Sequence, residues 1–281
     1  MPSTAELFPY LSGSSPQLGI IGLGQMAQAL LRPLLEQDLL KREQVVACVA
    51  NHASALNLQQ KYQIEVGLDP APCLNTPFLL LAIKPQQLEL FLQHPAHSIE
   101  LSTPQPLLIS VLAGVKLERL QRAFPNHSVV RAVPNTPALV QEGLIGLSYG
   151  ADVTDIQRSQ VSALFKPLGQ VFELPESQLD AFLALAASGP AFAALVVEGL
   201  ADGGVAAGLP RQLALDLAAK MLKGSAVLIE KQGLHPAQLK DMVSSPGGTT
   251  IAGLRELERC GLRSALMEAV VKAAERSRQF G

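Results

Sequence analysis

The sequence predicts an α/β protein, with an N-terminal doubly wound, Rossmann-type parallel sheet domain followed by an all-α C-terminal domain that dimerises. Three observations lead to this prediction. Continuous apolar runs recur in the first half of the chain, as expected of parallel strands buried on both faces. A glycine-rich turn follows the first run, as in dinucleotide-binding folds. After about Leu174 the apolar residues recur with a helical period, and Ala and Leu dominate.

The strands of the N-terminal domain are expected where apolar runs stop at Gly, Pro or a polar residue. The first strand covers Leu18–Ile21, and a glycine turn and a helix at about Met26–Gln37 follow it. The other strands are expected at Val45–Ala50, Phe78–Ile83, Leu107–Leu112 and Val129–Val133, with a last strand pair at Ile145–Tyr149 and Gln170–Glu173. Strands of this kind, spaced by helical segments, predict a doubly wound sheet.

The C-terminal domain reads as a succession of helices. They are expected at Ser177–Ala187, Pro190–Ala207, Arg211–Lys231, His235–Val243, Thr249–Arg259 and Leu262–Gln279. The segment Ala191–Ala207 is apolar around much of its circumference, which is typical of a buried helix. Because one small core does not need this much apolar surface, the sequence predicts a homodimer or higher homo-oligomer through the C-terminal helices.

The length of 281 residues fits two domains of about 100–200 residues each. We expect a flexible extension rich in Ser and Pro at 1–16, a dinucleotide-binding domain at 17–174, and an all-helical substrate-binding and oligomerisation domain at 175–281. Hydrophobic residues make up 48% and charged residues 16%, which is enough for a sizeable core and excludes a disordered chain.

The charge and cysteine content restrict partners and compartment. A formal net charge of −2 gives no general attraction to nucleic acid or to an anionic membrane. The N-terminus lacks the basic and apolar regions of a secretory signal. Three scattered cysteines, Cys48, Cys73 and Cys260, suit a reduced, cytoplasmic protein. His94 and His97 lack a second ligand pair, so no metal site is expected.

The clearest chemical signal is the turn Gly22-Leu23-Gly24-Gln25-Met26-Ala27, which fits the dinucleotide-binding pattern G-x-G-x-x-[G/A] between a strand and a helix. In this pattern the first glycine makes the tight turn and the second lets the backbone approach the pyrophosphate, while Ala27 allows the helix to pack closely. The helix N-terminus then offers N–H groups and partial positive charge to the phosphates. We therefore expect all six residues to bind a dinucleotide.

Further cofactor contacts are expected at the carboxyl ends of the other strands, where ligands bind in doubly wound sheets. The second strand ends in Ala50-Asn51-His52-Ala53-Ser54 without an acidic residue for a free ribose 2′-hydroxyl. This favours NADPH, with NADH as the alternative, and Asn51 is the expected contact. The other strand ends contribute Ala82, Ile83, Lys84, Pro85, Ala113, Gly114 and Asn135. The Asn135 amide is expected to orient the nicotinamide or the substrate.

In the segment Ser244-Ser245-Pro246-Gly247-Gly248-Thr249-Thr250, the first five residues form a tight turn before a helix that begins at Thr249. Its backbone N–H groups, the hydroxyls of Ser245 and Thr250, and the helix dipole can form a compact pocket for a small carboxylate. The alternative is a helix-capping turn without a ligand.

This segment resembles the signature of the pyrroline-5-carboxylate reductase family. The similarity extends from Leu18 to about Gln279 and includes Ala82-Ile83-Lys84-Pro85, Val133-Pro134-Asn135-Thr136-Pro137, Ser188-Gly189-Pro190-Ala191-Phe192, Gly208-Leu209-Pro210-Arg211 and His235-Pro236. The chain departs from the family's usual Ser-Gly-Ser-x-Pro pattern at Ala186 and Ala187.

The resemblance implies NAD(P)H-dependent reduction of 1-pyrroline-5-carboxylate to L-proline, the last step of proline biosynthesis. It implies that Ser245, Gly247, Gly248, Thr249 and Thr250 hold the substrate, and that the Thr250 hydroxyl is the catalytic group at the ring nitrogen. A protonated imine already accepts hydride, so alignment and exclusion of water suffice without a strong acid.

Two alternatives share this architecture. One is another imine reductase or a β-hydroxyacid dehydrogenase, which needs a helix lysine as general acid or base; Lys220 and Lys223 are the candidates by position. The other is a non-catalytic relative that binds a dinucleotide, which the Ala186-Ala187 departure would fit.

Overall fold

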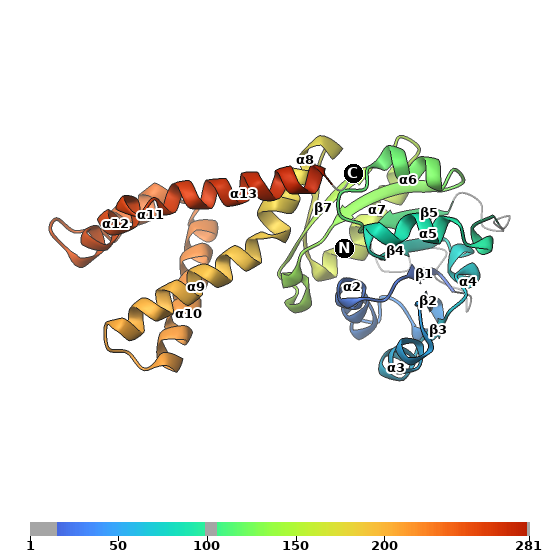
Figure 1. Cartoon of the computed structure of the whole chain (residues 1–281), viewed down its shortest axis with the longest axis horizontal. Coiled ribbons are helices and arrows are strands. Elements are labelled where there is room, and N and C mark those ends of the chain that lie inside the picture. Colours follow the sequence, from blue (N-terminus) through green and yellow to red (C-terminus); the bar gives the residue numbers. More distant parts are fainter. Residues whose placement is uncertain (1–15, 99–105, 280–281) are drawn as a thin grey trace. The chain divides into compact units, whose positions relative to one another are not determined.

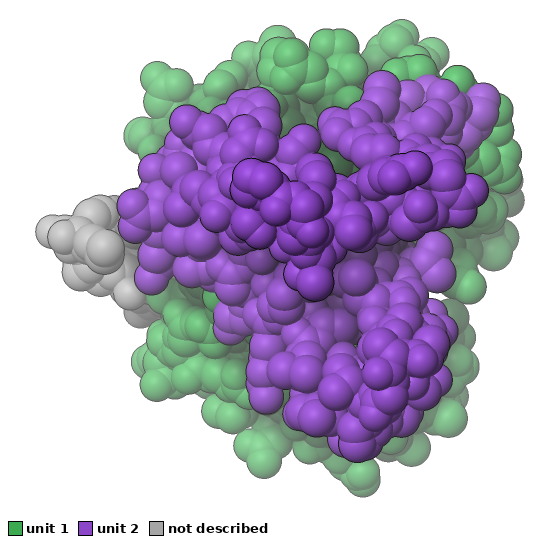
Figure 2. All heavy atoms as spheres, turned by 90° about the vertical axis from the view of Figure 1, so that its left-hand side faces the viewer, with its two compact units in different colours: residues 1–187, 273–281 green, residues 188–272 purple. Residues whose placement is uncertain are grey.

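The computed structural model describes residues 16–98 and 106–279. The predicted extension at 1–16 therefore lies outside the described residues except for its last one. The chain divides into two compact units (Figure 2), of which the first contains residues 1–187 and 273–281 and the second contains residues 188–272. The predicted boundary at 174/175 coincides with the start of a helix, and the compact units divide thirteen residues later, after Ala187.

The first unit is built on one sheet in which the strands follow the order β3-β2-β1-β4-β5-β6-β7-β8 (Figure 1). Their bounds are β1 (Leu18–Ile21), β2 (Val45–Cys48), β3 (Glu65–Gly67), β4 (Phe78–Leu81), β5 (Leu107–Ser110), β6 (Ser128–Val133), β7 (Gly143–Tyr149) and β8 (Gly169–Glu173). Neighbouring strands are parallel except for β6 and β7, which are antiparallel. The predicted doubly wound sheet is confirmed, and its last two strands pair with each other as expected.

Helices cover both faces of this sheet. One face packs against α2 (Gln25–Glu36), α3 (His52–Tyr62) and α7 (Asp155–Phe165). The other packs against α4 (Ala71–Leu74), α5 (Leu88–Leu92) and α6 (Leu117–Ala123). Within β1, for example, Leu18 and Ile20 join the first core cluster and Ile21 joins the second. Because side chains alternate between two buried faces, β1, β2 and β4 contain apolar residues and glycine throughout. The strand β6 also contains the buried Arg131.

The strands differ from the predicted ones mainly at their carboxyl ends. The strands expected to end at Ala50, Ile83 and Leu112 end two residues earlier, at Cys48, Leu81 and Ser110. The residues that follow leave the sheet to form loops at its carboxyl edge, and apolar character alone does not separate such residues from the strand. The edge strand β3 was not predicted, because its three residues contain one buried side chain, that of Val66, and so show no period.

Short helical turns complete the first unit. They are the 3₁₀ turns η2 (Arg42–Gln44), η3 (Pro85–Gln87), η4 (Pro95–Ser98), η5 (Thr136–Val140) and η6 (Lys166–Leu168), the helix α8 (Glu176–Phe182), and the π-helical turn η7 (Leu183–Ala187).

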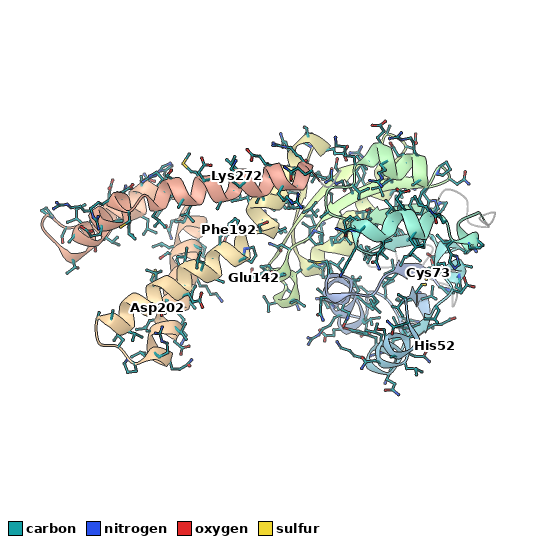
Figure 3. The ribbon with its side chains drawn as sticks, in the orientation of Figure 1. His52, Cys73, Glu142, Phe192, Asp202 and Lys272 are labelled. Atoms are coloured by element: carbon teal, nitrogen blue, oxygen red, sulfur yellow. The ribbon has the colours of Figure 1, made fainter. Side chains whose placement is uncertain are left out.

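The second unit is helical, as predicted. Its helices are α9 (Gly189–Ala206), α10 (Arg211–Gln232), α11 (Pro236–Met242), α12 (Thr249–Arg259) and α13 (Leu262–Arg278), whose last residues belong to the first unit. Phe192 and Asp202 lie on α9 (Figure 3). The prediction that this apolar helix is buried is wrong for the single chain, since Leu195 is 69% exposed and Ala201 is its buried residue. Its apolar surface exceeds what α10 alone can cover.

One helical stretch in the described ranges, Glu176–Ala206, is long and apolar enough to cross a membrane by these two criteria, and 11% of its most apolar window is buried. Length and composition do not separate a membrane span from an apolar helix that packs against another protein chain. The stretch also carries Glu176, Asp180, Glu198 and Asp202, which are costly in lipid.

Candidate active site

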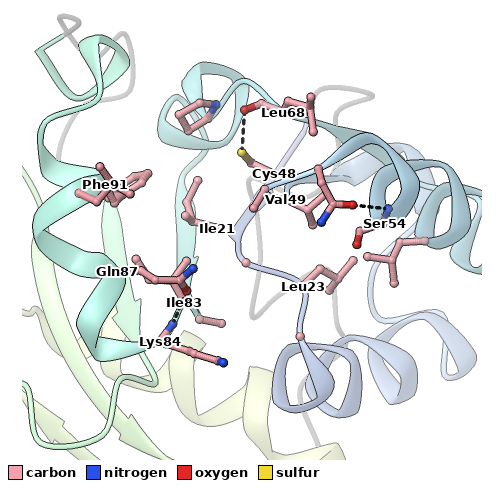
Figure 4. A pocket seen from close by; sticks show the side chains of 18 of the residues that line it. Ile21, Leu23, Cys48, Val49, Ser54, Leu68, Ile83, Lys84, Gln87 and Phe91 are labelled. Carbon is pink, nitrogen blue, oxygen red and sulfur yellow. Dashed lines mark hydrogen bonds between the residues drawn. The ribbon is translucent and has the colours of Figure 1, made fainter.

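A cleft of about 1040 Å³ opens at the carboxyl edge of the sheet, between the ends of β1, β2 and β4. The chain passes from β1 to β2 on one side and later to β4 on the other side. The cleft therefore lies at the point where the strand order reverses, which is where doubly wound sheets bind their ligands. In Figure 4, Ile83, Lys84 and Phe91 line one side, and Leu23 and Ser54 line the other.

The glycine turn forms the floor of this cleft. The Gly22 N–H donates to the Cys48 carbonyl at 2.9 Å, and Gly22 has a φ of +88°, a conformation that favours glycine. A Cβ atom on Gly22 would also lie 2.9 Å from the Ala82 carbonyl oxygen. A Cβ atom on Gly24 would meet nothing within 4 Å, so the backbone at the start of α2 faces open space. This geometry suits a phosphate at a helix N-terminus.

The end of β2 forms the neighbouring wall. Asn51 caps α3, since its Oδ1 accepts from the Ser54 N–H at 2.9 Å. Both residues line the cleft. With Oδ1 engaged, the Asn51 amide NH₂ and the Ser54 hydroxyl remain as donors for a ligand.

The loop after β4 forms the opposite wall. Ala82, Ile83 and Lys84 line the cleft, and Lys84 is exposed. The Lys84 N–H donates to the Gln87 Oε1 at 3.0 Å. This bond fixes the start of η3 and leaves the lysine ammonium free to reach the cleft.

The structure thus brings together the predicted cofactor residues Gly22, Leu23, Gly24, Asn51, Ala82, Ile83 and Lys84 around one cleft. Gln25, Met26, Ala27 and Pro85 adjoin these residues in the chain but do not line the cleft. Ala27 is buried, as expected for close packing of α2. Ala113 and Gly114 follow β5, and Asn135 follows β6, outside the residues that line the cleft.

Asn135 has a structural environment that its position in the sequence did not predict. Its side chain is buried, its Nδ2 donates to the Ala186 carbonyl at 2.9 Å, and its Oδ1 accepts from the Leu144 N–H at 2.9 Å. The side chain therefore ties η7 to β7. These bonds use the amide oxygen and one of the two amide hydrogens, so a contact with nicotinamide or substrate stays a prediction.

Several residues that line the cleft were not predicted as site residues. The polar ones are Gln28, Asn57, Gln87 and His94, and the others are Ile21, Cys48, Val49, Ala50, Ala53, Leu58, Leu68, Pro70, Leu90 and Phe91. The Cys48 Sγ donates to the Leu68 carbonyl at 3.3 Å, and burial raises the pKa of this thiol to about 11. The Nδ1 of His94 accepts from the Ala96 N–H at 3.2 Å. Among the described residues, no cluster of three side chains could hold a metal ion.

The predicted substrate turn lies in the second unit, before α12. Gly247 has a φ of +67°, and the Gly248 N–H donates to the Ser245 carbonyl at 3.0 Å. A Cβ atom on Gly248 would lie 2.3 Å from the Ser245 Oγ and 3.1 Å from the Ser245 carbonyl oxygen, so a larger residue here would require the Ser245 side chain to move. Gly247 and Gly248 line a hollow of about 580 Å³. Thr250 is half-buried in the first turn of α12.

Comparisons with known proteins identify the family. The chain is 45% identical over 268 residues to a pyrroline-5-carboxylate reductase of Synechocystis sp., an alignment covering 95% of this chain and 99% of that relative. Its fold is similar to that of a Plasmodium falciparum pyrroline carboxylate reductase with NADP bound, with a TM-score of 0.84, 29% identity, and coverage of 95% and 99% of the two chains. The chain belongs to the pyrroline-5-carboxylate reductase family. The resemblance drawn from the sequence is confirmed.

Two family models divide the chain between the units. Residues 17–114 match a model described as NADP oxidoreductase, coenzyme F420-dependent, and residues 176–280 match one described as pyrroline-5-carboxylate reductase dimerisation. The first match and the NADP-bound relative support a nicotinamide dinucleotide cofactor. The second match supports homo-oligomerisation of this pyrroline-5-carboxylate reductase family member.

The chain shares only its fold with the β-hydroxyacid dehydrogenases, which the sequence left open as an alternative. A 3-hydroxyisobutyrate dehydrogenase of Salmonella typhimurium has a TM-score of 0.52 at 16% identity, covering 72% of each chain. Lys220 pairs with Asp216 at 3.7 Å on an exposed face of α10, and nothing in this arrangement favours a catalytic lysine over the family's reaction.

Proposed function

We propose that this enzyme reduces 1-pyrroline-5-carboxylate to L-proline with NADPH, and thereby completes proline biosynthesis. One observation carries the proposal. The cleft lies where the strand order reverses and is lined by the glycine turn, in a chain that belongs to the pyrroline-5-carboxylate reductase family. The relatives are pyrroline-5-carboxylate reductases, and a small cyclic imine acid suits the turn before α12.

The cleft residues fit a dinucleotide. The open space over Gly24 leaves room for a pyrophosphate at the N-terminus of α2, and the cleft volume is at the upper end of the ~300–1,000 Å³ usual for ligand sites. The ribose side of the cleft has the Asn51 amide and the Ser54 hydroxyl as donors, and no carboxylate lines it among the described residues. Donors without a carboxylate favour the 2′-phosphate of NADPH over the free hydroxyl of NADH.

The turn before α12 is proposed to bind the substrate carboxylate. No side chain caps α12 among the described residues, so the N–H groups of its first turn can donate to an anion. Backbone or hydroxyl donors would come from Ser245, Gly247 and Thr249, whereas Gly248, whose N–H is bonded to the Ser245 carbonyl, would hold the shape of the turn. The Thr250 hydroxyl would hydrogen-bond the ring nitrogen and relay its proton.

The main task of the protein in this reaction is to position the imine and the nicotinamide. The bound nicotinamide supplies a hydride, and a protonated imine carbon accepts it without a strong protein acid. The chain's residues would hold the carboxylate, orient the ring nitrogen at Thr250 and exclude water. We propose that seven further residues support cofactor binding: Gln25, Met26, Ala27, Pro85, Ala113, Gly114 and Asn135. Ala27 and Asn135 would act through the packing described above.

The active assembly is proposed to be a homodimer or higher homo-oligomer built through the C-terminal helices, with no nucleic acid or membrane partner. The apolar surface of α9 and α10 would then be covered by a second copy of the chain. We also propose a cytoplasmic location, where NADPH is supplied and the three thiols stay reduced.

The test is NADPH oxidation in the presence of 1-pyrroline-5-carboxylate, with proline as the measured product, for the wild type, Thr250→Ala and Thr250→Ser. We expect the alanine variant to lose roughly 10²-fold in kcat, the serine variant to retain most activity, and both to bind NADPH as the wild type does. NADPH binding without turnover by the wild type would overturn the proposed reaction, and full activity of Thr250→Ala would overturn the assignment of Thr250.

A further inference from the structure

Gln28 makes a set of side-chain contacts beside the glycine turn that the reaction described above does not use. It lies in the first turn of α2, is half-buried and lines the cleft. Its Nε2 donates to the Leu23 carbonyl at 3.1 Å. Its Oε1 accepts from the Tyr62 hydroxyl at 3.0 Å and from the Lys61 Nζ at 2.9 Å. The orientation of the amide is unambiguous, because an ammonium can only donate and a carbonyl can only accept.

These partners belong to two segments of the chain, of which the glycine turn lines the cleft and the end of α3 lies behind it, outside the described residues that line it. Leu23 is the middle residue of the glycine turn, whereas Lys61 and Tyr62 end α3. The Tyr62 ring is buried, and the Lys61 Nζ lies 4.9 Å from its centre. Gln28 therefore connects the turn that would hold the pyrophosphate with the helix whose other end, at Asn51, would hold the ribose.

The bond to Leu23 has a direct consequence for Gly24. The Leu23 carbonyl and the Gly24 N–H belong to one planar trans peptide, so they point in opposite directions. When Gln28 holds the carbonyl, it also sets the direction of the Gly24 N–H. The Gln28 backbone N–H donates to the Gly24 carbonyl at 2.9 Å, so both peptide groups of Gly24 are fixed by one residue. Glycine turns otherwise have wide conformational freedom.

We propose that Gln28 is a positioning residue for the dinucleotide, which holds the glycine turn in its binding conformation before the cofactor arrives. This inference rests on the proposed function, since it requires that the cleft bind a dinucleotide. Ordering a loop in advance strengthens binding because the ordering cost is not incurred on association. The contribution should appear in binding of ligands that reach the glycine turn and not in binding of ligands that stop at the ribose.

The experiment measures dissociation constants of NADPH and of adenosine 2′-phosphate, a fragment without pyrophosphate, for the wild type and Gln28→Leu. We expect Gln28→Leu to bind NADPH about tenfold more weakly, which corresponds to ~1.4 kcal/mol, and to bind the fragment as the wild type does. Gln28→Glu keeps the acceptor for Tyr62 and Lys61 but cannot donate to Leu23, so it should bind NADPH at least as weakly. Gln60→Leu, on the exposed surface of α3, is the matched control and should behave as the wild type.

Steady-state kinetics separate positioning from general damage. In Gln28→Leu the KM for NADPH should rise while kcat and the KM for the imine stay within about twofold of the wild type. Tyr62→Phe, which removes one of two donors to Oε1, should have the smaller effect. NADPH binding by Gln28→Leu that equals the wild type, or an equal loss of NADPH and fragment binding, overturns the proposal. Failure of the wild type itself to bind NADPH or NADH would instead overturn the proposed function, and the role of Gln28 with it.

Discussion

In the first unit of the chain the sheet and its helices bury their apolar side chains among themselves, whereas in the second unit most large apolar side chains remain exposed. Two clusters of buried residues cover the two faces of the sheet. The helical unit has one buried cluster, and its fully buried members are the small residues Ala201, Ala214 and Ala218. Its exposed large residues include Leu195, Leu213, Leu217, Met221, Leu228, Met242, Val243 and Met267.

The difference indicates that the first unit is complete as a single chain and that the second is not. Soluble monomers rarely expose contiguous apolar surface on this scale. The exposed surface falls within residues 176–280, which match the dimerisation model. A second copy of the chain is therefore the expected cover, and the helical unit should depend on assembly for its stability.

The largest effect is expected from a charge placed on this surface. Leu217 is 48% exposed in the single chain and lies one turn from Leu213 and Met221 on α10. Leu217→Glu would bury an unpaired carboxylate, and in a two-fold interface each mutation acts twice. We expect the dimer dissociation constant to rise by at least about 100-fold with loss of activity, measured by sedimentation and by NADPH oxidation.

The matched control is Ile156→Glu on α7 of the first unit, because Ile156 is 69% exposed but lies outside the dimerisation match. This variant should assemble and react as the wild type does. Equal dissociation by both variants, or by neither, would contradict the contrast between the two units.

The two units also differ in whether their ion pairs are buried or exposed. In the first unit the buried Arg131 pairs with Glu176 at 3.1 Å and with Asp180 at 3.6 Å. Glu176 also accepts from the Leu117 N–H, and Asp180 accepts from the Ser277 hydroxyl, each at 2.7 Å. In the helical unit the ion pair between Arg263 and Glu258 is exposed on both sides.

Arg131→Met should destabilise the protein by about 3–5 kcal/mol, because it leaves two partly buried carboxylates without their cation. The matched variant Arg263→Met removes an exposed arginine, whose hydrogen bond lowers the pKa of Glu258, and solvent screening makes such pairs weak. Urea unfolding at one fixed protein concentration compares the two. Similar losses of stability in both variants would show that the buried cluster has no special role.

The sequence predicted the elements of this fold well because the determining forces are local in the chain. Continuous apolar runs identified the central strands, and the helix α12 has the bounds expected, Thr249–Arg259. The glycine turn was recognisable because Gly22 has a positive φ, whereas Gly24 leaves open space in which a phosphate can approach the backbone. The antiparallel order of β6 and β7 carries no comparable signal, since side-chain alternation is the same in either direction.

The site was less predictable where it depends on contacts between distant segments. The apolar wall formed by Leu68, Leu90 and Phe91 has the composition of a core. Gln28 meets residues more than thirty positions away, and no spacing rule links α2 with the end of α3. Asn135 stood at the predicted strand end, but its bonds to Leu144 and Ala186 depend on the path of the chain after it.

The smallest expected difference between the two units is the effect of their cysteine thiols on how stability changes with pH. Burial raises the pKa of Cys73 to about 12 and that of Cys48 to about 11, and Cys73 lies in the core of the first unit (Figure 3). Cys260 in the helical unit is exposed. The folded state thus retains protons that the unfolded chain releases near pH ~8.5. The stability that the two buried thiols contribute is fully present below that pH and is lost as pH rises toward the folded-state pKa values.

The melting temperature of the wild type should therefore fall more steeply from about pH 9 to about pH 11 than that of a Cys48→Ala/Cys73→Ala variant. Other titrating groups, such as lysines, act equally in both proteins, so the difference in slope isolates the two thiols. Cys260→Ala should retain the wild-type slope, because its thiol is exposed in the folded chain as in the unfolded one. Parallel curves for the wild type and the double variant would contradict the assigned cost of ionising thiols in the sheet core, whereas a flattened curve for Cys260→Ala would mean that the helical unit buries this thiol when it assembles.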